Sequence, residues 1–161
     1  MARITTNTTG TQPVITVTYS GASLTDPTIA LTVPFVQDVT ITNATGVYSY
    51  TTFTDSDQRK LSTPANNELA TNIVIDNTAF FGANVANVTA VGQGLMNLSS
   101  HKTAIDFKIF WAGNTSSVTD ATTTGTGFLT SIAAKTSPTA PVWVTPLNIA
   151  VDGSMVSGLN G

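Results

Sequence analysis

Apolar and polar residues alternate one by one along much of the chain. The clearest runs are residues 15–19 (ITVTY), 29–35 (IALTVPF), 39–42 (VTIT) and 105–111 (IDFKIFW). Because successive side chains of a β-strand point to opposite faces, this period of two is typical of strands with one buried face. Val, Ile and Thr recur throughout these runs, and β-branched side chains pack well on a pleated sheet. The pattern therefore predicts a mostly β protein.

The residues between these runs predict how the strands are connected. Asn43-Ala44-Thr45-Gly46 separates two alternating stretches with residues that favour turns, so we expect a β-hairpin there. Pro34 cannot donate a ladder hydrogen bond, which predicts that the strand over 29–35 lies at a sheet edge or ends at the proline. Residues 114–127 are polar and Thr-rich and are expected to form a connector.

A different period appears over residues 84–98, where apolar side chains recur every three or four positions, as on one face of a helix. These side chains are Val85, Val88, Val91, Leu95 and Leu98. Gly92 and Gly94 each cost about 1 kcal/mol relative to Ala inside a helix. We predict a helix over 84–98, and the alternative is an irregular packed loop.

Further strands are predicted over residues 69–76, 128–134 and 147–155. A chain of 161 residues is long enough for one core and short for two, so we expect a single domain over 1–161. With about eight strands and one helix, the expected fold class is an antiparallel β-sandwich or barrel with one flanking α-helix.

Residues 53–68 lack the alternation that surrounds them. This segment holds five of the fifteen charged residues of the chain and almost no apolar side chain. A loop of this length without its own structure is uncommon in a compact domain, and such loops are usually functional or disordered. We therefore predict a long polar loop over 53–68.

The residue types that carry out catalysis are scarce. The absence of cysteine excludes disulfides, thiolate metal sites and a Cys nucleophile. His101 is the single imidazole, and without a nucleophile motif or an orienting group around it we interpret it as a solvent-facing loop residue. Asp55 and Asp57 lack the glycine turn and the downstream Glu of a calcium loop. We expect no enzymatic activity and no cofactor.

Two other motifs favour ordinary structural roles. Residues 125–127 (GTG) lack the third glycine and the following helix of a phosphate-binding loop. Trp111 and Trp143 could stack on a base or a sugar, but large aromatic side chains dominate buried contacts, so we expect both in the core.

The balance of charge argues against a protein that grips nucleic acid. The net charge is −3, only 9% of residues are charged, and the six Lys and Arg form no basic run. The N-terminus has no apolar segment after Arg3, and no stretch of the chain approaches the length of a membrane span. We expect no secretory signal, no membrane partner and folding in a cytoplasm.

Three segments near the end of the chain carry a resemblance to a known family. They are residues 104–110 (AIDFKIF), 127–132 (GFLTSI) and 141–155 (PVWVTPLNIAVDGSM). Following two strands, a hairpin, a polar loop and a helix, they resemble the major tail tube proteins of tailed bacteriophages, over most of the chain. The departures are the two glycines in the predicted helix and the Thr-rich surface.

The resemblance implies a structural virion protein. Six subunits would close a ring by joining their sheets edge to edge, and rings would stack into a tube through which the genome is ejected. Implied partners are further copies of the chain and the tail sheath, tape measure, baseplate and tail terminator proteins. DNA would pass without specific binding, because acidic side chains repel phosphates. The location would be the phage tail, assembled in the host cytoplasm.

Within this family the polar loop becomes the candidate contact to the neighbouring ring, and the alternative is a flexible hairpin tip. Its candidate contact residues are Asp55, Asp57, Arg59, Lys60, Leu61 and Glu68. Two other functions stay open at this point. One is a capsid decoration protein or other accessory virion protein, and the other is a carbohydrate-binding module that uses Trp111 or Trp143.

Overall fold

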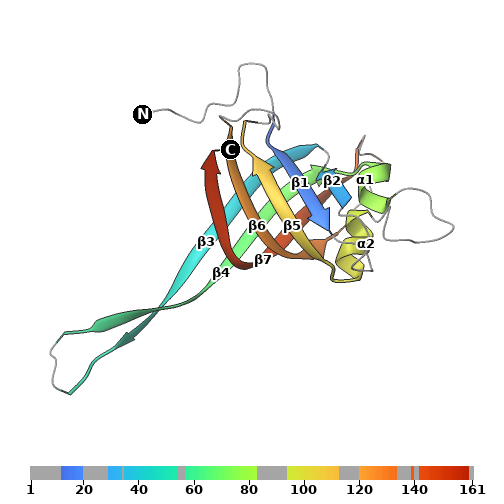
Figure 1. Cartoon of the computed structure of the whole chain (residues 1–161). Helices are drawn as coiled ribbons and strands as arrows, with labels where there is room; N and C mark the ends of the chain where they lie inside the picture. Colours follow the sequence, from blue (N-terminus) through green and yellow to red (C-terminus); the bar gives the residue numbers. More distant parts are fainter. Residues whose placement is uncertain are drawn as a thin grey trace.

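The computed structural model describes residues 12–19, 29–33, 35–53, 57–82, 94–112, 120–133, 139 and 142–159. These residues form seven β-strands and two short α-helices (Figure 1). In chain order the elements are β1 (Val14–Tyr19), β2 (Ile29–Val33), β3 (Val36–Tyr50), β4 (Arg59–Val74), α1 (Asn77–Phe81), α2 (Leu95–Ser100), β5 (Ala104–Phe110), β6 (Ala121–Ile132) and β7 (Val144–Leu159). The prediction of a mostly β protein is confirmed.

All strands belong to one antiparallel sheet in the order β2-β1-β5-β6-β7-β4-β3. The two edge strands, β2 and β3, are joined by only two residues, so Val33 and Val36 lie at most about 11 Å apart. A sheet whose first and last strands meet in this way must curl on itself. The result is the barrel-like form in Figure 1, as the sequence predicted.

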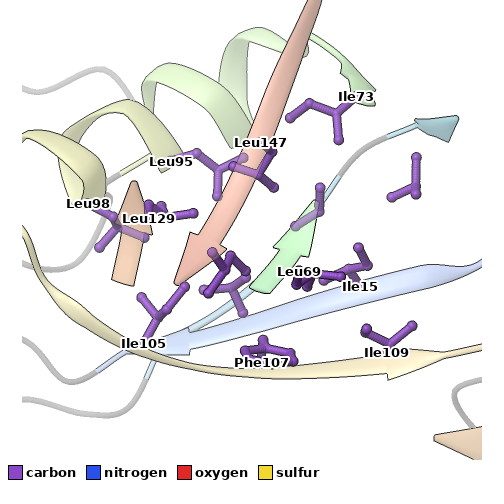
Figure 2. Packing of buried hydrophobic residues seen from close by; sticks show 14 of the residues in the cluster. Ile15, Leu69, Ile73, Leu95, Leu98, Ile105, Phe107, Ile109, Leu129 and Leu147 are labelled. Atoms are coloured by element: carbon purple, nitrogen blue, oxygen red, sulfur yellow. The ribbon is translucent and has the colours of Figure 1, made fainter. Parts of the chain in front are cut away.

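The core fills the inside of this curled sheet. Alternate residues of each strand point inward, which is the physical basis of the period of two in the sequence. The largest fully buried side chains are Phe80, Ile15, Leu69, Ile73, Leu95, Leu98, Ile109, Leu147, Ile149, Val17 and Thr145. Figure 2 shows Leu95 and Leu98 of α2 beside Leu129 and Leu147 of the sheet, so α2 covers one side of the core.

Two sequence predictions about connections meet different outcomes. The strand at 29–33 lies at the sheet edge, as expected from Pro34. The connector predicted over 114–127 is wrong from Ala121 onward, because β6 begins there, and 114–119 lie outside the described residues. The Thr-rich segment pairs with both β5 and β7, and Thr fits a pleated sheet although it lacks strong hydrophobicity.

The helix prediction over 84–98 is wrong in its start. α2 begins at Leu95 with Gly94 in extended conformation as its N-cap, and residues 84–93 lie outside the described residues. A side chain at Gly94 would overlap the backbone of Phe80 and Gly82, so this glycine allows the two helices to approach. The sequence analysis missed α1, a single turn capped by the Asp76 carboxylate, which accepts hydrogen bonds from two backbone N–H groups.

Gly127 of β6 provides a test of the strand packing. A Cβ atom there would overlap the carbonyl oxygen of Ala150 and lie 3.0 Å from Cγ2 of Ile149. Because β6 is held between β5 and β7, neither backbone can move freely. We expect Gly127→Ala to lower the free energy of unfolding by about 1–3 kcal/mol in guanidinium denaturation. Gly158→Ala is the control, since nothing lies within 4 Å of its Cβ position. Equal midpoints for the two variants would contradict this packing.

Candidate assembly surfaces

β3 and β4 extend beyond the rest of the sheet as a two-stranded arm. β4 pairs with β7 only from Glu68 to Val74, whereas its pairing with β3 continues to Tyr50 opposite Arg59. We call residues 43–67 the arm, because its strands pair only with each other. Eight strand residues at about 3.4 Å each give it a reach of about 27 Å. Figure 1 shows the arm projecting on the side of the barrel away from the two helices.

The arm corrects two sequence predictions. The prediction of a hairpin turn at 43–46 is wrong, because β3 continues through these residues. A register shift between Ala44 and Gly46 accommodates them within the strand. The prediction of a polar loop over 53–68 is wrong for residues 59–68, which belong to β4. Pairing with β3 satisfies the backbone there, while both faces of the arm meet solvent. A strand without a buried face needs no alternation, so the period of two is absent.

Asn67 and Gly153 mark the place where β4 and β7 part. The Asn67 side-chain Nδ2 donates to the carbonyl oxygen of Gly153 at 2.8 Å, and its Oδ1 is buried without a hydrogen-bond partner. Gly153 has a φ of 85°, in the region that favours glycine. From this point β7 continues along β6, and the arm leaves the sheet.

The two faces of the arm differ in character. Tyr48 lies opposite Leu61 and Tyr50 opposite Arg59, and the two tyrosine rings stack at 6.3 Å. Tyr48 is 60% exposed and Leu61 55%. We call the face with Tyr48, Tyr50 and Leu61 the aromatic face. The opposite face pairs Val47 with Ser62 and Ser49 with Lys60 and is mostly polar.

Exposed apolar side chains on such an arm indicate a partner. An isolated two-stranded hairpin is at best marginally stable in water. Contiguous apolar surface rimmed by polar residues is typical of interaction sites. Phe53, at the turn of the arm, is also fully exposed. The arm therefore has the composition of a segment that packs against another molecule.

Four of the six candidate contact residues lie on this arm. Arg59, Lys60 and Leu61 are exposed on its outer strand segment, with Lys60 on the face opposite to the other two. Asp57 is exposed at the turn, Glu68 is exposed at the base beside β7, and Asp55 lies outside the described residues.

The sequence analysis missed the apolar members of the arm. Val47, Tyr48 and Tyr50 looked like part of an ordinary strand, and Phe53 was assigned to the polar loop. The signal available was the position of this strand next to a segment rich in charge, which offers no buried partner.

A second exposed apolar surface lies at the opposite end of β4. Val74 N donates to Phe35 O at 3.2 Å and Ile75 N donates to Trp143 O at 2.8 Å, which brings residues 35 and 143 to either side of β4. Phe35 is 65% exposed and Trp143 is 44% exposed. We define the end patch as Phe35, Val142 and Trp143, all of which are exposed.

The end patch corrects the prediction that Trp143 is a core residue. Trp143 precedes the first residue of β7, where the chain has not yet entered the sheet, so its ring remains partly in solvent. Trp111 packs against the core as expected, and its Nε1 donates to Thr123 Oγ1 at 3.0 Å.

The outer face of the barrel carries a row of threonines with few charges. Thr16, Thr124 and Thr126 donate to carbonyl oxygens of the neighbouring strands at 3.1–3.4 Å. Their hydroxyl groups are therefore engaged with the sheet itself. Asp106 and Lys108 lie in the same surface hollow.

The remaining chemistry is sparse. In the described part of the chain, no three His, Cys, Asp or Glu side chains gather as they would to hold a metal. His101 is exposed at the end of α2, as expected for a solvent-facing residue. No helix among the described residues has the length and hydrophobicity needed to cross a membrane.

Comparison with known proteins identifies solved structures with a similar fold. No family model and no curated protein matches the chain. Among solved structures, a chain of the virion of a native gene transfer agent particle aligns with a TM-score of 0.55 and 11% identity, covering 88% of this chain and 95% of that one. A chain of the sheath–tube complex of an extracellular contractile injection system (PVC, extended state) aligns with a TM-score of 0.53 and 11% identity, covering 92% and 89%.

The chain has a tail-tube-like fold. The resemblance seen in residues 104–110, 127–132 and 141–155 is thus confirmed for the fold. A third alignment supports the same fold, with a chain from the structure of the anti-feeding prophage cap, described as a tube terminating cap. Its TM-score is 0.51 and its identity 13%, and it covers 99% of this chain and 94% of that one.

Proposed function

We propose that this chain is a structural subunit of a phage tail or a phage-tail-like particle and builds its tube by self-assembly. The observation that carries the proposal is the projecting arm on a tail-tube-like fold. The arm exposes an aromatic face and unpaired strand edges, and neither is satisfied within one copy of the chain.

Strand edges support the same proposal. Among the described residues, β2 and β3 are the first and last strands of the sheet and each pairs on one side only. Such edges pair with other chains unless they are covered, and a cyclic arrangement of identical subunits covers each edge with the next. We infer stacked rings, with six subunits in each ring as the family resemblance implies, and contact between rings through the arm.

The surface chemistry suits a conduit for DNA. The chain has a net charge of −3 and no basic run, so a wall built from it would repel phosphates rather than bind them. The threonine hydroxyls of the outer face already donate to backbone carbonyls. The proposed role is mechanical and needs neither catalysis nor a cofactor.

The partners follow from this proposal. The aligned chains come from structures of a sheath–tube complex, a baseplate and a tube terminating cap. We propose that this chain contacts sheath, tape measure, baseplate and terminator proteins as well as copies of itself. Its place would be the tail of the virion, after assembly in the host cytoplasm.

Negative-stain electron microscopy of the purified protein tests the proposal. We expect rings, or tubes of uniform width that lengthen with protein concentration. Small oligomers that bind only to capsids would support a decoration protein instead. A monomer retained by a glycan column would support a carbohydrate-binding module. Either of these two results would overturn the tube proposal.

A further inference from the structure

The arm and the end patch have matching chemistry on one chain. We propose that the aromatic face of the arm in one copy docks on the end patch of the next copy. The inference rests on the proposed function and identifies the surface that receives the arm. It pairs Tyr48, Tyr50 and Leu61 with Phe35 and Trp143.

The arm cannot reach the patch of its own chain. It leaves the sheet beyond Glu68, whereas Phe35 and Trp143 lie at the other end of β4, beside Val74 and Ile75. Figure 1 shows the arm pointing away from the helices, and α1 begins two residues after Ile75. Only a second copy can bring the two surfaces together.

The contact would be heterologous, because the two surfaces differ. A heterologous contact leaves one arm and one patch unused at the two ends of every oligomer, so addition continues until a ring closes or a filament grows. Such a contact can build a tube of any length from a single kind of subunit. A symmetric arm-to-arm contact would instead stop at a dimer.

A basic residue lies on the aromatic face, and two acidic residues lie beside the end patch. Arg59 lies opposite Tyr50, on the aromatic face of the arm. Asp38 and Asp76 flank the end patch. Asp38 lies in β3, shortly after Phe35, and Asp76 directly precedes α1, the helix that ends at Phe81. Their carboxylates accept hydrogen bonds from Asn72 and from the first turn of α1 and remain acidic neighbours of the patch. Complementary charge favours this docking over contact between two arms.

Photo-crosslinking locates the surface that receives the arm. Tyr48→benzoylphenylalanine keeps an aromatic ring on the aromatic face, and Ser49→benzoylphenylalanine places the same probe on the opposite face of the same strand. A small fraction of each labelled chain is co-assembled with wild-type protein, irradiated and digested. We expect the probe at position 48 to attach to peptides that contain residues 35 or 142–143, and the probe at position 49 not to do so.

Substitutions give an independent readout. We expect Leu61→Asp and Trp143→Ser each to raise the critical concentration for assembly by about tenfold or more, which is the effect of about 1.4 kcal/mol. Ser62→Asp, next to Leu61 but on the other face, should change it by less than about threefold. All three positions are exposed, so circular dichroism should show folded subunits.

The outcomes separate this inference from the proposed function. Attachment of the position 48 probe to the end patch, with the two apolar substitutions impairing assembly, supports the docking. Tubes in which position 48 attaches elsewhere, or in which Trp143→Ser has no effect, overturn the docking and leave the tube proposal in place. Wild-type protein that never assembles overturns both.

Discussion

A variant without the arm is expected to fold and to form no tubes. The variant replaces residues 45–65 by Asn-Gly, which joins Ala44 to Asn66. These residues are direct partners in the register, and Asn-Gly favours the tight turn of a two-residue hairpin. None of the described side chains of the arm belongs to the central core, so the barrel should retain its stability.

This design follows from the finding that residues 59–68 form part of a strand and not a loop. Deleting only residues 55–66 would remove one strand of the arm and leave residues 44–50 of β3 without partners. The shortened variant removes both strands of the arm together and keeps the hydrogen bond from Asn67 to Gly153 at the base of the arm. We expect complete loss of tubes in electron microscopy with a native circular dichroism spectrum. Normal tubes from this variant would show that the arm is not needed for assembly.

Two leucines of β4 are expected to respond in opposite ways to truncation. Leu69 is fully buried in the core, while Leu61 of the same strand is exposed on the arm. Leu69→Ala should lower the free energy of unfolding by about 2–5 kcal/mol, because it leaves a cavity among packed side chains. Leu61→Ala should change it by less than about 0.5 kcal/mol and should weaken assembly instead.

Guanidinium denaturation below the assembly concentration measures the first effect, and the critical concentration measures the second. Comparing two leucines of one strand keeps the chemistry of the substitution constant. Similar losses of folding stability for both would mean that the arm is packed within its own subunit. That result would contradict the separation of core and arm.

The part of the fold that has one buried face could be predicted from the sequence. Ile15 and Val17 of β1 and Ile105 and Phe107 of β5 point into the core, and their alternation with polar residues reveals the strands. The mostly β class, the edge position of β2 and the resemblance to tail tube proteins all derive from such segments.

The arm could not be predicted because the same signal is absent there. Both of its faces meet solvent, so residues 59–66 vary without a period of two and looked like a loop. Gly46 and its neighbours have turn propensity, yet pairing across the arm decides their conformation. Tertiary pairing often overrides such local preference.

The end patch depends on which strands become neighbours. Phe35 and Trp143 are more than a hundred positions apart, and the sheet order places them on the two sides of β4. Nothing local to either residue distinguishes an exposed aromatic side chain from a core one. The contact role of residues 53–68 stays a prediction, and the surface proposed to receive the arm could be identified only from the structure.

Sedimentation velocity of the wild-type protein over a range of concentrations tests the central claim most directly, since that claim is self-assembly through the arm. We expect the 16.7 kDa subunit at low concentration and a steep growth of large species above a critical concentration. One species of subunit mass at every concentration would contradict the account.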